Sequence, residues 1–475
     1  MPQERPYRET RAAAQLAAIG RATPGLVVAL GAAALVTVGL VAGCESAAER
    51  LIVAAPEGAL TVVFAADNQG VLSSCGCPSN PSGGFAKRQT IIDKYRRVRP
   101  DLVVVDAGDL FPDRPNAQKV PYLARALERA RYDAIAVGDQ EFLLGAAHLR
   151  TLVKEQKLPL LCANVRDDQG EPVVPGHVIR TVGGRRVGIF AVISPDVMPI
   201  PPQDWRKGLR IEPPLEAARR EVQALAGCDP IIALSHQSIR ETEALARGVP
   251  GIRIVVSGHD EALYRKPVTV GAATVVATGP VGRQVGALTI TQGAEGSPLL
   301  VQEMTGLSEK VPDARWVMDI YWQYVKKAKG EPPPDWALVP DLPEYEPAEK
   351  CQKCHEAETK QWRTTRHANA YESIKRVKRN EDPECILCHT MAYGRENGFF
   401  TMEETPGLGR VTCQACHPVM STHSEDKKKT EPPKPLTARA CLSCHGLIQS
   451  PDFDFAAYKP RIAHGKLEAP AAEKK

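Results

Sequence analysis

The chain has 475 residues, a length sufficient for two or three domains. Its apolar fraction of 43% is ordinary for a folded protein, and its formal net charge of +4, with no basic run interleaved with aromatic residues, argues against a nucleic-acid partner. Eight of the thirteen cysteines fall in pairs between Cys351 and Cys444, so the C-terminal third has a chemistry of its own.

The first 43 residues have the layout of a secretory signal. Four arginines precede an uncharged apolar run over 26–41, and small residues then lead to Cys44. This order resembles a bacterial lipobox, in which cleavage leaves a lipidated cysteine first in the chain. The alternative is an uncleaved membrane anchor, because 24–43 is nearly long enough to span a bilayer. Both interpretations predict an extracytoplasmic chain that a short tether, 44–58, joins to a membrane.

Residues 59–310 alternate between short β-branched runs and helical stretches. The expected strands are 60–66, 102–106, 134–137, 231–234 and 252–256, and the expected helices include 122–131 and 215–226. Such alternation predicts an α/β fold with a largely parallel core sheet. Three later runs, 273–278, 284–291 and 299–304, are punctuated by glycine and predict antiparallel strands. We therefore expect a layered α/β sandwich with helices outside.

A change of composition predicts a domain boundary after this region. Residues 311–345 read as a helix followed by a proline-rich, acidic linker, which is the composition of a stiff, extended segment. From 346 to 466, cysteine, histidine, lysine and proline rise while aliphatic runs disappear. A domain with so few aliphatic residues must bury something else, such as haem. Residues 467–475 have the composition of a disordered tail.

Four Cys-x-x-Cys-His motifs occupy this C-terminal domain. They are Cys351-Gln-Lys-Cys354-His355, Cys385-Ile-Leu-Cys388-His389, Cys413-Gln-Ala-Cys416-His417 and Cys441-Leu-Ser-Cys444-His445. Two thiols one turn apart reach both vinyl groups of one porphyrin, and the following histidine becomes the proximal iron ligand. A zinc site or disulfides would use the cysteines but would not require a histidine after every pair. The repetition predicts four covalently bound haem c groups.

Three further histidines in this domain, His367, His423 and His464, are candidates for the sixth iron ligands. Three histidines for four haems predict three bis-histidine irons and one iron with another ligand or none. Bis-histidine ligation favours outer-sphere electron transfer, because no coordination position is left for a substrate.

The segment from Cys351 to Ala370, with Trp362 and then Arg366-His367-Ala368, resembles the tetrahaem cytochrome c family that accepts electrons from hydroxylamine oxidation. The resemblance covers about 346–465. It implies that His367 serves the haem of Cys413 and Cys416, that His423 serves that of Cys351 and Cys354, and that His464 serves that of Cys441 and Cys444. It also implies an open distal face on the haem at His389, which Met391 or Met402 could close.

Acidic and imidazole side chains follow the expected strands of the N-terminal domain, where ligands gather in layered α/β folds. They are Asp67, Asp109, Asp139, His236 and His259. The segments around them, from Ala66-Asp67-Asn68-Gln69-Gly70 to Ser257-Gly258-His259-Asp260, resemble the ordered metal-binding blocks of the 5′-nucleotidase branch of calcineurin-like metallophosphoesterases. The resemblance implies an αββα sandwich with one or two divalent ions (Mn, Fe or Zn), Asp109 as the bridging carboxylate, and Asp67, His236 and His259 as ligands.

The chain departs from that family at four positions. Gln69 replaces a histidine of the first block, Asp139 and Gln140 replace an asparagine and a histidine of the third, and Glu261 replaces a histidine of the last. Carboxylates remain good ligands for hard cations, so Asp139 and Glu261 stay candidate metal ligands with Gln69. A glutamine cannot act as an acid, however, so ordinary phosphoesterase catalysis is not expected.

Four cysteines lie outside the haem motifs and the signal-like segment. The loop of Cys75 and Cys77 is either a turn with a strained local disulfide or a redox or soft-metal site. Cys162 and Cys228 either pair with each other or are buried core residues.

The sequence as a whole predicts a membrane-tethered, extracytoplasmic multihaem cytochrome c that transfers electrons, with a metallophosphoesterase-like binding or docking domain. Two alternatives stay open: a hydrolase of phosphate or sulfur esters coupled to the haems, and a redox enzyme for small nitrogen compounds at the haem of His389. The expected partners are redox proteins or quinone-linked electron donors.

Overall fold

The structure is a computed structural model, and it describes residues 52–74, 82–197, 206–292, 298–331, 338–339, 341–418, 436–446, 448–450 and 452–464. The signal-like segment with Cys44, the loop of Cys75 and Cys77, and His423 lie outside these residues. Within the described residues, no helix combines the length and the apolar character needed to cross a bilayer. Residues 47–475 belong to one compact unit.

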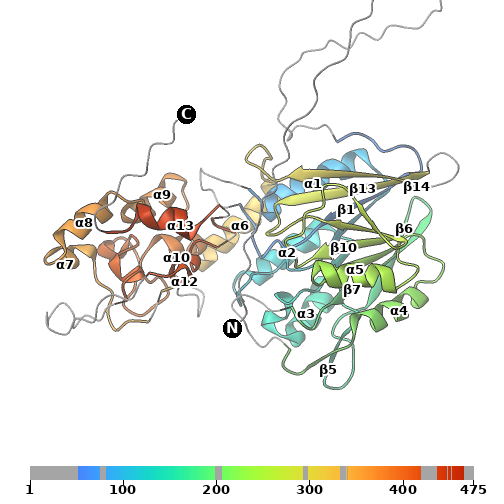
Figure 1. The fold of residues 1–475 in the computed structure, drawn as a ribbon, viewed down its shortest axis with the longest axis horizontal. Helices are drawn as coiled ribbons and strands as arrows, with labels where there is room; N and C mark the ends of the chain where they lie inside the picture. Colours follow the sequence, from blue (N-terminus) through green and yellow to red (C-terminus); the bar gives the residue numbers. More distant parts are fainter. Residues whose placement is uncertain are drawn as a thin grey trace, which may run out of the picture. The chain divides into compact units, whose positions relative to one another are not determined.

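The first of two large sheets has the strand order β14-β13-β1-β2-β3-β4 (Figure 1). Its strands are β1 (Leu60–Ala65), β2 (Leu102–Asp106), β3 (Ala134–Ala136), β4 (Leu160–Leu161), β13 (Gln284–Gln292) and β14 (Pro298–Gly306). Strands β1 to β4 run parallel, whereas β13 is antiparallel to both β1 and β14. The antiparallel pairing predicted for the last two strands is therefore confirmed.

The second sheet has the order β11-β12-β10-β9-β7-β6. Its strands are β6 (His177–Val182), β7 (Arg185–Ile193), β9 (Ile231–His236), β10 (Ile254–Gly258), β11 (Val268–Val270) and β12 (Ala273–Ala277). One prediction was wrong in part: β12 is antiparallel to β11 but parallel to β10. Gly271, with a φ of 63°, lies in the tight turn between β11 and β12, so β11 occupies the sheet edge and β12 enters the parallel core.

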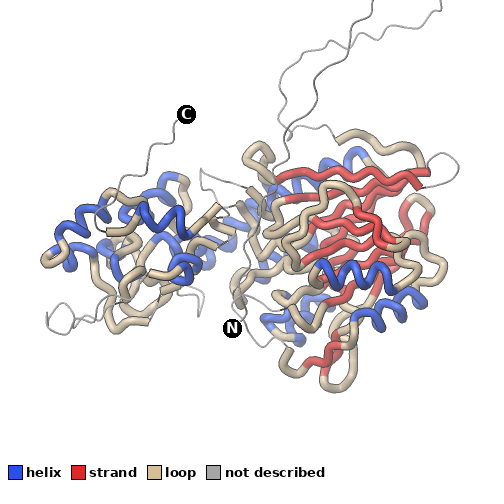
Figure 2. The backbone as a smooth tube through the Cα atoms, viewed as in Figure 1, coloured by secondary structure: helices blue, strands red, loops and turns tan. Residues whose placement is uncertain are grey.

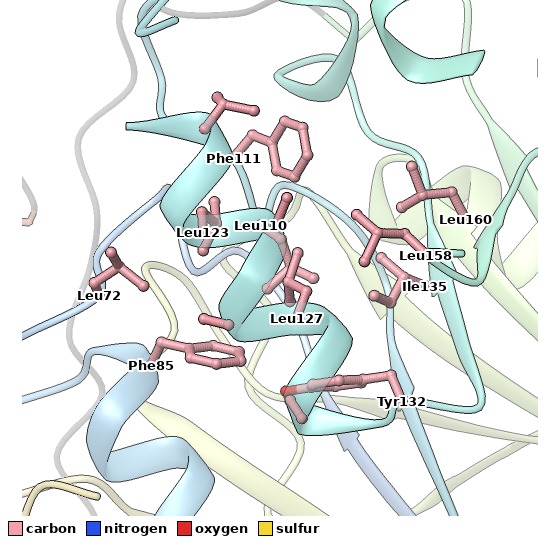
Figure 3. Close-up of a cluster of buried hydrophobic side chains, with 14 of the residues drawn as sticks. Leu72, Phe85, Leu110, Phe111, Leu123, Leu127, Tyr132, Ile135, Leu158 and Leu160 are labelled. Carbon is pink, nitrogen blue, oxygen red and sulfur yellow. The ribbon is translucent and has the colours of Figure 1, made fainter. Parts of the chain in front are cut away.

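Helices cover the outer face of each sheet. The first sheet packs against α1 (Phe85–Val98), α2 (Val120–Ala130), α3 (Ala146–Gln156) and α6 (Arg315–Ala328) through the cluster drawn in Figure 3. The second packs against α4 (Pro214–Ala224) and α5 (Ile239–Gly248). Between the sheets lies a third apolar layer, which includes Val62, Val105, Ile189 and Val256. Because both faces of each sheet are covered, the central strands are apolar throughout, and the αββα sandwich is confirmed.

The C-terminal region consists of short helices and loops, and none of its described residues lies in a strand (Figure 2). The helices are α7 (Ala348–Gln352), α8 (Glu356–Arg363), α9 (Ala370–Arg376), α10 (Pro383–His389), α12 (Ala438–Leu442) and α13 (Phe455–Tyr458). A small apolar cluster that includes Tyr371, Met391 and Phe399 packs beside α9 and α10.

Helix α6 forms polar contacts with the start of α10. The Tyr321 hydroxyl donates to the buried carboxylate of Asp382, which caps α10, and Arg379 lies 3.2 Å from the same carboxylate. Lys119, just before α2, pairs with Glu384 in the first turn of α10. Helix α6 is thus a packed part of the fold, whereas the proline-rich segment that follows it lies mostly outside the described residues.

Candidate haem and metal sites

The haem motifs each form one helical turn. The backbone N–H of His355 donates to the carbonyl of Cys351 at 3.0 Å, and the third and fourth motifs repeat this bond at 2.9 Å. The second motif lies at the C-terminal end of α10. Such a turn gives the two thiols and the imidazole the spacing that thioether attachment and iron ligation need.

The described cysteines form no disulfide. None of the eight motif cysteines forms a disulfide, and neither does Cys162, which is buried, or Cys228. The pairing of Cys162 with Cys228 was therefore wrong, and the core position was correct for Cys162. Cys351 is hydrogen-bonded to Cys413 and Cys388 to Cys444, so the first motif lies beside the third and the second beside the fourth.

Two pairs of imidazole rings have the centre-to-centre distance expected of two ligands of one iron. The ring centres of His367 and His445 are 6.1 Å apart, and those of His417 and His464 are 6.2 Å apart. A metal–imidazole bond is about 2 Å long and the ring centre lies about 1.1 Å further on, so two imidazoles on opposite sides of one ion have centres about 6 Å apart. The ring-centre distances of these two pairs match this value.

These ring pairs differ from the ligand assignment that the cytochrome resemblance implied. That assignment joined His367 to the third motif and His464 to the fourth, whereas the His367 ring lies near His445 of the fourth motif and the His464 ring near His417 of the third. Order along the chain does not show which distant histidine reaches which motif, because the intervening turns decide it. The partner of His355 was expected to be His423, which lies outside the described residues.

Hydrogen bonds orient two of the proximal imidazoles. His389 Nδ1 lies 2.8 Å from the Ala370 carbonyl oxygen and 3.0 Å from Ser373 Oγ, and His445 Nδ1 lies 2.9 Å from Ser450 Oγ. A ring that donates its Nδ1 proton to such a partner keeps the Nε2 lone pair for a metal. His389 would thus be an oriented ligand for a haem at the second motif.

A second group of ligands lies where the parallel strands of the sandwich end. Asp109, Asp139, His236 and His259 each offer a ligand atom, and these atoms all lie within 4.8 Å of one another. His236 Nε2 is 3.4 Å from Asp109 Oδ1 and 3.2 Å from Asp139 Oδ1, and His259 Nδ1 is 3.4 Å from Asp139 Oδ1. Carboxylate and imidazole donors in one compact group are the ligands that divalent transition metals bind.

Burial and close spacing shift the pKa values of three side chains in this group. Burial and the neighbouring Asp139 carboxylate raise the pKa of Asp109 well above its ordinary value. Burial alone would lower the pKa of His236, but the carboxylates of Asp109 and Asp139 raise it well above the usual value. Burial would raise the pKa of Asp139, yet hydrogen bonds from the two histidines hold it below its ordinary range. A divalent cation would take the place of the shared protons.

The other predicted ligands lie outside the group of four. Asp67 is next to it, with Oδ1 accepting the His259 N–H at 3.0 Å, and burial raises its pKa to about 7. Gln69 donates its backbone N–H to the Asp109 carbonyl at 2.8 Å, and Glu261 is exposed. Asp67, Gln69, Asp109 and His259 all have φ between 51° and 67°, a left-handed conformation that is concentrated at this site.

Sequence reasoning missed three residues that hold the site in place. The fully buried Glu141 accepts the backbone N–H groups of Asp109, Leu110 and Gly138 at 2.7–3.2 Å. Arg88 pairs with Asp106 at 2.6 Å and donates to the Ala66 carbonyl at 2.8 Å, with both charged side chains fully buried. Glu141 follows Asp139 closely enough to have been a candidate, but no sequence pattern pairs Arg88 with Asp106.

Close approach between backbone and ligands requires glycine at two positions. A Cβ on Gly138 would collide with the Asp109 carboxylate and the His236 ring, and one on Gly108 would lie 2.6 Å from His236 Nδ1. Gly108 also has a φ of 103°, which disfavours any other residue.

Comparisons with known proteins divide the chain in the same way. Residues 350–418 match the family model for cytochrome c554 and c-prime. The 5′-nucleotidase of Homo sapiens is 30% identical over 229 residues, which are 45% of this chain and 40% of that protein. The trifunctional nucleotide phosphoesterase of Bacillus subtilis is 25% identical over 225 residues, 40% of this chain and 15% of that protein.

A solved structure gives the same result for the fold. The 5′-nucleotidase precursor of Thermus thermophilus superimposes with a TM-score of 0.51 at 25% identity, over 57% of this chain and 59% of that one. The chain spans less than two thirds of the length of each of these relatives. The N-terminal region therefore has a metallophosphoesterase-like fold similar to that of 5′-nucleotidases, and the C-terminal region matches the cytochrome c554 family.

Proposed function

We propose that this protein transfers electrons through four haem c groups in its C-terminal region and that the phosphoesterase-like region is a metal-binding or docking module. The observation that carries the proposal is the pair of imidazole couples, His367 with His445 and His417 with His464, at ring separations of 6.1 and 6.2 Å. The match to the cytochrome c554 family and the helical turn of the motifs support haem attachment.

Haem c would supply an iron that changes oxidation state without changing its protein ligands. The motif cysteines would hold the porphyrins, and the two histidine couples would supply ligands to two of the irons. The Ala370 carbonyl and Ser373 would orient His389 at the second haem. Residues that fix ligand orientation limit rearrangement during electron transfer.

We also propose an extracytoplasmic location, with attachment to a membrane through Cys44 or the apolar segment before it. The support is the signal-like order of basic, apolar and small residues at the N-terminus. Haem attachment to Cys-x-x-Cys-His motifs agrees with export. The partners would be redox proteins or quinone-linked donors.

The test is a haem count on the full chain expressed with a haem-maturation system. We expect an intact mass that corresponds to four haems, a matching pyridine haemochrome value, and complete reduction by dithionite. Replacing both cysteines of one motif by alanine should remove one haem and leave three. A wild-type protein with fewer than four haems, or with irons that dithionite does not reduce, would contradict the proposal.

A second candidate function is metal-dependent ester hydrolysis, which the convergence of Asp109, Asp139, His236 and His259 favours. Gln140 replaces the acid-base histidine of the family that this region resembles, which weighs against efficient turnover. The test is hydrolysis of phosphate monoesters, phosphate diesters and sulfate esters by metal-loaded protein. His236→Ala serves as the inactive control. Turnover that matches this control would exclude the hydrolase.

A further inference from the structure

The distances within the ligand group of the N-terminal region suit a single ion. Ligand atoms bonded at about 2.1 Å to one tetrahedral ion lie about 3.4 Å from one another. Three distances among the His236, His259, Asp109 and Asp139 ligand atoms measure 3.2, 3.4 and 3.4 Å, and all of these atoms lie within 4.8 Å of one another. The ligand atoms are thus close to the spacing of one coordination sphere.

A hydrogen bond holds His236 in the tautomer that can bind the same ion through Nε2. Its Nδ1 lies 2.8 Å from the Ala107 carbonyl oxygen, an acceptor that fixes the proton on Nδ1. The Nε2 lone pair then faces the two carboxylates. The ring is fully buried, so this orientation does not change with solvent.

The next residue along the chain from Asp139 has a buried acceptor without a partner. Gln140 is 6% exposed, and its backbone N–H donates to Asp109 Oδ1 at 3.2 Å, which places the residue at the group. Its side-chain Oε1 is buried without a hydrogen-bond partner. Buried acceptors are normally satisfied, and a water bound to a metal ion is a donor that would satisfy this one.

A second ion would find few ligands beside the first. Asp67 would contribute a carboxylate, but its Oδ1 already accepts the His259 N–H. Gln69 offers only a neutral amide, and Glu261 is exposed outside the group. A second dication would therefore add two positive charges to a buried site that gains only one further carboxylate.

We propose that the N-terminal region binds one divalent transition-metal ion through Asp109, Asp139, His236 and His259, and that it does not form a two-ion centre. Two imidazoles and two carboxylates favour Fe, Mn or Zn over Mg or Ca. A single ion lacks the partner that clamps the attacking and leaving oxygens in two-metal hydrolysis. The proposal defines the metal-binding role assigned to this region in the proposed function.

The experiment counts non-haem metal in the purified holoprotein by mass spectrometry of metals, with haem iron measured separately and subtracted. We expect one ion per chain in the wild type and in Asp67→Asn, and none in His259→Ala. His148→Ala, at a histidine outside the group, should retain one ion.

Two ions in the wild type, none in the wild type, or a loss of metal in Asp67→Asn would each overturn the proposal. Haem absorbance reports whether each variant has matured. A normal haem count with no non-haem metal refutes this inference alone, whereas missing haem with one bound ion refutes the electron-transfer proposal alone.

Discussion

The assignment of His464 to the haem of the third motif can be tested directly. The His464 ring centre lies 6.2 Å from that of His417, the distance expected across one iron, and His464 is exposed, so its replacement leaves the apolar cluster intact. His464→Ala should remove one axial ligand from one iron of the four proposed. About a quarter of the haem iron should then change from low-spin to high-spin, because ligand loss weakens the field at that iron.

Spin counting by electron paramagnetic resonance measures this change, and added imidazole should reverse it. The identity of the affected haem follows from combining His464→Ala with removal of one haem. With the third haem removed by Cys413→Ala/Cys416→Ala, His464→Ala should create no additional high-spin iron. With the fourth haem removed by Cys441→Ala/Cys444→Ala, it should still create one.

The opposite pattern would restore the assignment implied by the cytochrome resemblance and refute the reasoning from ring distances. A spectrum that His464→Ala leaves unchanged would remove His464 from the ligands altogether. His148→Ala, in α3, is the matched control and should leave the haem spectrum as it is in the wild type.

Three further outcomes follow from the described contacts. Arg88→Leu should lower the unfolding free energy of the sandwich by about 3–5 kcal/mol, because it leaves the buried Asp106 carboxylate without its partner. Urea titration followed by far-ultraviolet circular dichroism measures this loss. The double variant Arg88→Leu/Asp106→Leu should recover part of it. Gly138→Ala should abolish non-haem metal binding, since the new methyl group would collide with Asp109 and His236, whereas Gly306→Ala, where the nearest atom lies 3.7 Å away, should not. Burial raises the pKa of Asp382 from 3.8 to about 7, so the folded state binds its proton more tightly than the unfolded chain does. Its stabilising contribution is present below about pH 4 and is lost as the pH rises to about 7, by at most about 1.4 kcal/mol per pH unit. Asp382→Asn should flatten this part of the curve of melting temperature against pH, and an unchanged curve would show that Asp382 does not titrate there.

Much of the sandwich could be predicted from local pattern. The strand predicted at 102–106 has the same bounds as β2. A short β-branched run of this kind is typical of a strand that is covered on both faces. Strand β12 shows what the local pattern cannot predict. Its residues predict a strand, but the strands that pair with it depend on where the chain returns after Gly271. Pairing direction is a property of the assembled sheet.

The sequence by itself determined the chemistry of both sites, because thioether attachment needs a five-residue motif and the metal ligands directly follow strands that are recognisable from their residues. Only the tertiary structure decided which ligands meet. It brought the His367 ring near that of His445 and the His464 ring near that of His417, and it gathered Asp109, Asp139, His236 and His259 while leaving Gln69 and Glu261 outside. Contacts between residues far apart in the chain depend on the path of every turn between them, and no local pattern records that path.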